Sequence, residues 1–189
     1  KTSFAMRLID TLSSMGGNTI FIDLEEITSI DHFFNAFYGE LVKLPETKAV
    51  EKVKAKMKKW LSGVEFSTTG LPVKATVKME SSDNNDFKDL ADILNTLDNH
   101  TLVVFDELTV LLKSLSEKYD NEQAVRTFLN QFRAMRSATS EECTWLICSS
   151  VGVRNFTTQH NLSDTINDVA DFEQAKIGRA VQQECRDRY

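Results

Sequence analysis

Two neighbouring carboxylates end a short apolar stretch in the middle of the chain. Residues 102–105 read Leu-Val-Val-Phe, and Asp106 and Glu107 follow directly. An apolar run of this length is typical of a buried strand in a parallel sheet. Ligands of open α/β sheets bind beyond the carboxyl ends of the strands. We therefore expect Asp106 to complete the shell of a divalent cation and Glu107 to act as a general base on a water. The alternative is a pair of acids that stabilises the N-terminus of the next helix.

The first residues of the chain resemble the end of a phosphate-binding loop. Lys1 and Thr2 match the last two positions of the form G-x-x-x-x-G-K-[ST], which an amphipathic helix follows. We expect the glycines to precede Lys1, so that the sequence starts inside the loop. Lys1 would then contact the β- and γ-phosphates, Thr2 would ligate Mg²⁺, and Ser3 would belong to the same nucleotide site. The alternative is an arbitrary start before an ordinary helix.

Further polar residues follow the next apolar stretch, residues 144–148. Ser149 and Ser150 stand at its end, where one of them would touch the γ-phosphate or the attacking water. A developing negative charge also needs an arginine, and the nearby candidates are Arg133, Arg136 and Arg154. We expect each of these arginines to lie on the surface, and a second subunit is an alternative source of the catalytic arginine.

The composition limits the other possibilities. The 189 residues carry a net charge of −6, with 41% hydrophobic and 26% charged residues. These values are typical of a soluble globular protein, and no stretch approaches the roughly 18 consecutive apolar residues that span a bilayer. Three cysteines without metal-ligand spacing favour a reducing cytoplasm. The net negative charge disfavours a protein whose whole surface binds nucleic acid. The lysines of residues 48–59 indicate a solvated helix face, and contact with nucleic acid or a membrane surface is the alternative.

The pattern along the chain predicts strands that alternate with helices. We expect buried strands at residues 19–24, 102–106 and 144–148, and helices at residues 2–14, 29–42, 86–97, 108–116 and 122–135. Such alternation implies a parallel sheet covered by helices on both faces. Residues 63–80 alternate apolar and polar around a Gly-Leu-Pro turn, which predicts a β-hairpin insertion. Residues 172–188 are polar and helical in propensity.

These motifs, in this order, resemble the archaeal-type ATPases of the AAA+/STAND branch of P-loop NTPases. The resemblance covers most of residues 1–170: the Lys-Thr remnant of Walker A, Asp-Leu-Glu at 23–25, the Walker B pair Asp106 and Glu107, and Ser-Ser-Val-Gly at 149–152. Ser149 replaces the first glycine of the family's G-S-[IV]-G turn. The resemblance implies a three-layer α/β P-loop core over residues 1–170, with strand order 5-1-4-3-2. Residues 171–189 would begin a helical or winged-helix extension.

The resemblance also implies a function. Members bind ATP with Mg²⁺ and act as switches or assembly modules within larger proteins, so we expect an ATPase that works as a homo-oligomer or with a partner protein. A defence or regulatory system would suit this branch. One alternative is a P-loop-fold interaction domain that does not hydrolyse nucleotide. Another is a DNA-acting AAA+ protein similar to origin-recognition factors, which the acidic charge disfavours.

Overall fold

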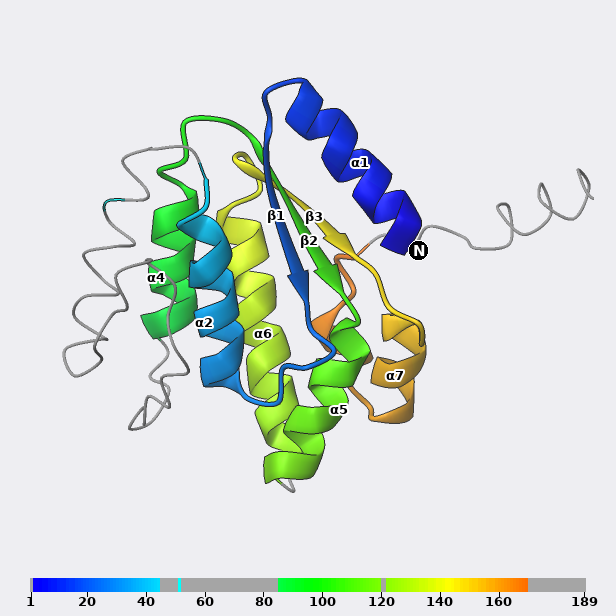
Figure 1. Cartoon of the computed structure of the whole chain (residues 1–189). Coiled ribbons are helices and arrows are strands. Elements are labelled where there is room, and N and C mark those ends of the chain that lie inside the picture. The colour runs from blue at the N-terminus through cyan, green and yellow to red at the C-terminus, as the bar shows by residue number, and fades with distance from the viewer. Residues whose placement is uncertain (1, 45–50, 52–84, 120–121, 170–189) are drawn as a thin grey trace, which may run out of the picture.

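The described part of the chain is built around three parallel strands. The computed structural model describes residues 2–44, 51, 85–119 and 122–169. β1 (Asn18–Asp23) pairs with β2 (Thr101–Asp106), and β2 pairs with β3 (Cys143–Ile147), all in parallel (Figure 1). The predicted α/β class and parallel sheet are confirmed. The described residues do not include Lys1, the hairpin predicted at 63–80 or the extension predicted at 171–189. Of the lysine-rich helix predicted at 48–59, they include only residue 51.

Helices cover both faces of this sheet. α1 (Thr2–Ser14) lies on one face, and α2 (Ile30–Leu41), α4 (Asn85–Leu94) and α6 (Glu122–Ala138) lie on the other (Figure 1). α5 (Leu108–Tyr119) follows β2, while α7 (Val153–Gln159) and a 3₁₀ turn (Ser163–Thr165) follow β3. The three layers are those expected from alternating strands and helices.

Burial on both faces explains the unbroken apolar run of β2. Alternate side chains of a strand point to opposite faces. Val103 and Phe105 join the core under α2, α4 and α6, whereas Leu102 and Val104 pack with Ala5 of α1. All six residues of β2 are buried. The central strand therefore has no solvated face that would call for polar residues.

Most predicted helix bounds are close to the observed ones. Ser29 caps α2, because its hydroxyl accepts a hydrogen bond from the backbone N–H of His32 at 3.2 Å. The helix predicted to reach residue 97 ends at Leu94, where the backbone tightens into a turn in which Leu97 N–H donates to Leu94 O. α7 and the 3₁₀ turn were not predicted, because residues 153–165 have few apolar positions at regular spacing.

The two described cysteines behave as small apolar groups. Cys143 and Cys148 are buried, one at the start of β3 and the other just after its end. Burial, with a smaller contribution from Glu142, raises the pKa of the Cys143 thiol to about 12. Its thiol is therefore protonated at neutral pH and serves packing rather than chemistry.

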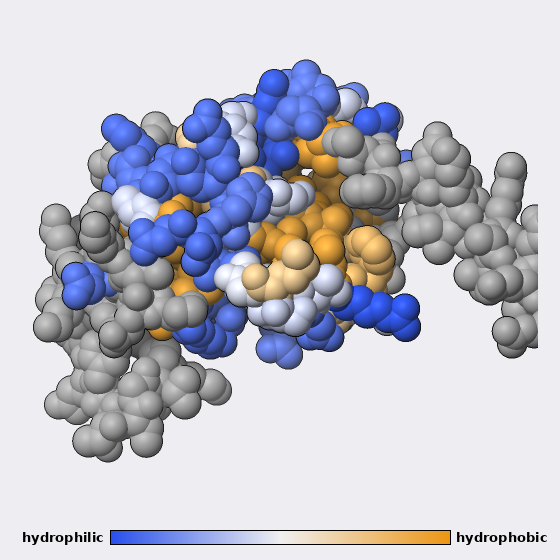
Figure 2. All heavy atoms as spheres, turned by 90° about the horizontal axis from the view of Figure 1, so that it is seen from above, coloured by the Kyte–Doolittle hydropathy of each residue, from blue (hydrophilic) through white to orange (hydrophobic). Residues whose placement is uncertain are grey.

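β3 is an edge strand within the described residues, since its only described neighbour is β2. Figure 2 shows a hydrophobic hollow in the middle of a surface that is otherwise largely hydrophilic. Phe4 of α1 and Met15, which follows the end of α1, are among the large apolar side chains that remain exposed. Trp145, Leu146 and Ile147 of β3 are themselves only partly buried, and an edge strand with apolar residues is a place where a further strand can pair.

The described residues contain no helix with the length and apolar character needed to cross a membrane.

Candidate functional site

The start of α1 and the end of β2 meet through one hydrogen bond. The Thr2 hydroxyl donates to Asp106 Oδ2 at 2.6 Å, although the two residues are 104 positions apart. α1 begins at the end of the sheet where β2 finishes, so its first turn lies over the carboxyl end of the strand (Figure 1). The structure therefore brings Thr2 and Asp106 together. Ser3 is exposed in the same turn, and Lys1 lies outside the described residues.

The local backbone fixes the position of Asp106. Its side chain is buried, with 6% exposed, and Oδ1 accepts a hydrogen bond from the backbone N–H of Glu107 at 3.1 Å. The carbonyl of Asp106 accepts from Leu24 N–H at 3.0 Å, and Asp106 lies in register with Asp23 of β1. Sheet pairing thus places the carboxylate at the edge of the sheet where β1 and β2 end, which we call the rim, with one oxygen towards Thr2.

Glu107 is held towards the end of β3. Both of its carboxylate oxygens lie 3.0 Å from the backbone N–H of Ser150, and the Ser150 hydroxyl donates to Oε2 at 2.8 Å. Glu107 also has a left-handed backbone, with φ of 57°. The structure therefore brings Thr2, Asp106, Glu107 and Ser150 into one connected polar row along the rim of the sheet.

Ser149 faces the interior instead. It is buried, and its hydroxyl shares a hydrogen bond with Thr109 Oγ1 and accepts another from Thr109 N–H at 3.3 Å. This buried pair joins the start of α5 to the end of β3. Ser150, which is exposed, is therefore the serine whose hydroxyl lies at the rim. Thr109 was not singled out from the sequence, where its only signal is a hydroxyl on the buried face of an apolar helix.

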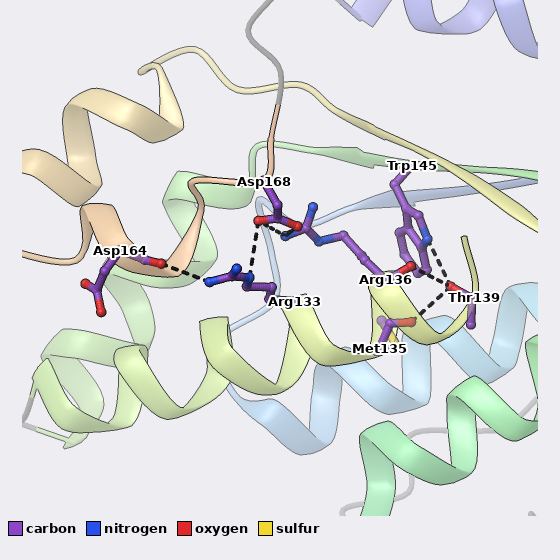
Figure 3. Close-up of polar contacts among 7 residues, drawn as sticks. All are labelled: Arg133, Met135, Arg136, Thr139, Trp145, Asp164 and Asp168. Carbon is purple, nitrogen blue, oxygen red and sulfur yellow. Dashed lines mark hydrogen bonds and ion pairs between the residues drawn. The ribbon is translucent and has the colours of Figure 1, made fainter. Parts of the chain in front are cut away.

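Two of the candidate arginines belong to a different cluster (Figure 3). Arg136 was expected on the surface, and this is wrong: its side chain is only 9% exposed and its Nη2 lies 3.0 Å from Asp168 Oδ2. Arg133 is half-buried, donates to the carbonyl of Asp164 at 3.1 Å and lies 3.7 Å from Asp168. Arg154 is exposed on α7, as expected.

The Arg136–Asp168 pair joins α6 to the segment that follows the 3₁₀ turn. Burial lowers the pKa of Arg136 from its ordinary value, and the Asp168 carboxylate raises it again in part. The guanidinium also lies over the ring of Phe132, 4.8 Å from its centroid. Sequence spacing gives no sign of this pair, because the partners are 32 residues apart.

Asp168→Asn is expected to destabilise the fold by about 2–3 kcal/mol, because it leaves the buried guanidinium of Arg136 without its counter-ion. Urea unfolding measures the change. Asp164→Asn is the matched control: that carboxylate is 66% exposed in its pair with Arg126, so its loss should cost about 1 kcal/mol or less. Equal losses in the two variants would contradict the assigned difference in burial.

The residues at the rim suit a magnesium ion that is held together with phosphate. The Thr2 hydroxyl and the Asp106 carboxylate are oxygen ligands, which Mg²⁺ prefers, and Mg²⁺ sites on nucleotides use only one or two protein groups. In the ranges that the structure describes, no group of three or more His, Cys, Asp and Glu residues is placed to hold a metal by itself. A cation here would depend on ligand oxygens from a bound phosphate.

Comparison of the chain with protein-family models, with curated proteins and with solved structures finds no match in any of the three.

Proposed function

We propose that this chain is the core of a Mg²⁺-dependent P-loop ATPase. The observation that carries the proposal is the hydrogen bond of 2.6 Å between Thr2 Oγ1 and Asp106 Oδ2. It joins the residue expected to end a phosphate-binding loop to the acid expected in the metal shell. Such a pair of oxygen ligands at the N-terminus of a helix is what a metal-bound triphosphate needs, because the helix end also supplies unpaired N–H groups.

The fold also supports the proposal of a P-loop ATPase core. In the order 5-1-4-3-2 that the resemblance implies, the strands numbered 2, 3 and 4 lie side by side. The observed order β1-β2-β3 agrees with these three strands. The implied order places a further strand, the one that leads into the phosphate-binding loop, beside β3. Trp145, Leu146 and Ile147 of β3 are only partly buried and would suit such a neighbour.

Each residue at the rim has a role in the proposed reaction. Bound Mg²⁺ would supply charge stabilisation at the phosphates. Lys1 would contact the phosphates, Thr2 and Asp106 would hold the cation, and Glu107 would orient and deprotonate the attacking water. The protein would act as a switch or assembly module with a second copy or a partner protein.

One observation favours the main alternative, an interaction domain with this fold that does not hydrolyse nucleotide. The Glu107 carboxylate is bonded to Ser150 through both oxygens, as in a purely structural joint between two loops. Measured turnover in the full-length protein separates the two functions.

The proposal predicts nucleotide binding that depends on both Mg²⁺ and Thr2. Thr2→Ala should weaken binding of a fluorescent ATP analogue in the presence of Mg²⁺ about tenfold or more, because it removes an oxygen ligand. Thr11→Ala is the matched control on the same helix, since the Thr11 hydroxyl donates to the carbonyl of Arg7. Titration of the full-length protein, with and without EDTA, provides the measurement. Absence of binding, or binding that EDTA and Thr2→Ala leave unchanged, would refute the proposed site.

A further inference from the structure

β1 is the second edge strand of the described sheet, since its only described neighbour is β2. The Leu24 N–H donates to the carbonyl of Asp106, so it points towards β2. Backbone groups of successive strand residues point in alternate directions, which turns the N–H and C=O groups of Thr19, Phe21 and Asp23 away from β2. Within the described part of the chain, these three residues have no backbone partner on that side. A row of hydrogen-bonding groups therefore runs along the outer edge of β1.

The sequence of β1 does not protect this edge. Edge strands that must stay single are commonly blunted by a lysine, a proline or a bulge. Residues 19–22 read Thr-Ile-Phe-Ile, which are β-branched and aromatic side chains that favour strands, and the register with β2 runs without a break. No described helix crosses in front of β1 in Figure 1. The edge is therefore suited to accept one more strand.

Negative charge at one end of the edge indicates which strand would bind there. Asp23, Glu25 and Glu26 are exposed where β1 ends. Within the described residues, none of their carboxylates forms an ion pair. A strand with lysine or arginine at the adjoining end would gain from these charges, whereas an acidic strand would be repelled.

The helices beside β1 limit what can approach its edge. α1 and α2 contact β1 from opposite faces of the sheet. A second copy that paired through its own β1 would press both helices against their counterparts. An extended segment brings no helix with it, and its main-chain hydrogen bonds supply the affinity. The edge therefore favours an extended segment of another protein over a second copy of this chain.

We propose that the outer edge of β1 binds an extended, basic segment of a partner protein, which adds to the sheet as an antiparallel strand. Antiparallel pairing is slightly more stable per residue than parallel pairing. In this orientation the amino end of the segment lies beside Asp23, Glu25 and Glu26, and its lysines or arginines stand there. The inference does not depend on the proposed ATPase function.

Two synthetic peptides test the proposal on the full-length protein. One has two lysines followed by alternating valine and threonine, and the other has glutamates in place of the lysines. Fluorescence titration should show at least about tenfold tighter binding of the lysine peptide. In amide hydrogen exchange followed by NMR, the bound lysine peptide should slow exchange at Thr19, Phe21 and Asp23. Exchange at Ile20 and Ile22 should stay the same, because their N–H groups already face β2.

Thr19→Pro and Thr19→Ala form a matched pair of variants. The proline removes one outward N–H and should weaken binding of the lysine peptide about fivefold or more, because a hydrogen bond is lost and the ring stands at the edge. The alanine keeps the N–H and should bind within about twofold of the unmodified protein. Replacing Glu25 and Glu26 together by lysine should remove the preference for the lysine peptide. Both glutamates are exposed, so this variant serves if Thr19→Pro does not fold.

Several results would overturn the inference. They are failure to bind either peptide, equal binding by Thr19→Pro and Thr19→Ala, and slower exchange at Trp145 and Ile147 of β3 in place of the β1 amides. Protection of the β1 amides that rises with protein concentration in the absence of peptide would assign the edge to a second copy, and the proposed partner would then be wrong.

Discussion

Glu107→Gln is expected to lower ATP turnover at least about 100-fold while ATP binding is retained. Glutamine has nearly the same shape as glutamate, and its amide oxygen can still accept hydrogen bonds from the N–H and hydroxyl of Ser150. It cannot take a proton from water, and a general base contributes roughly 10²–10⁴-fold to a rate. The loss should therefore fall on the chemical step, with the fold and the phosphate contacts kept.

Phosphate release and titration with a fluorescent ATP analogue, both on the full-length protein, measure the two halves of this prediction. Glu117→Gln is the matched control, because the Glu117 side chain is 68% exposed on α5 in a loose pair with Lys113. The control should hydrolyse ATP at the original rate. Equal turnover in Glu107→Gln and the unmodified protein would remove Glu107 from the reaction and favour the structural role that its bonds to Ser150 suggest.

Sequence reasoning is strongest where one stretch of chain carries the whole signal. Residues 102–105 of β2 are all apolar because α1 covers Leu102 and Val104 while the opposite helices cover Val103 and Phe105. Two-sided burial is a local property of the strand, so the run of residues predicts it. The acids that follow this run must then lie at the carboxyl end of the strand. Thr2 contacts Asp106 there because α1 begins at the same edge of the sheet.

Features that depend on distant partners leave no such signal. The sequence predicts that Arg136 lies on the surface, because its counter-ion Asp168 is 32 positions away in the chain. Glu107 has a left-handed backbone, and its carboxylate is bonded to Ser150, which is 43 positions away. In both cases the residue type disfavours the observed state, and tertiary contacts overcome that preference.

The second large effect predicted concerns the core that supports the rim. Phe33 is fully buried, and its ring packs against aromatic rings of three other elements: Phe87 of α4 at 6.0 Å, Phe105 of β2 at 5.6 Å and Phe128 of α6 at 5.3 Å between centroids. Phe33→Ala would open a cavity among all four elements. We expect a loss of about 3–5 kcal/mol in the free energy of unfolding, measured with urea.

Phe4→Ala provides the matched control, because the same side chain is removed where it is 58% exposed. Its cost should stay below about 1 kcal/mol. A whole domain is stable by only about 5–15 kcal/mol, so Phe33→Ala can leave too little folded protein to measure. Phe33→Leu then serves instead, with an expected loss of about 1–2 kcal/mol, since it keeps most of the buried volume. A loss at Phe33 no larger than that at Phe4 would mean that the ring cluster does not hold α2, α4 and α6 on the sheet. The position of Asp106 at the rim would then need another support.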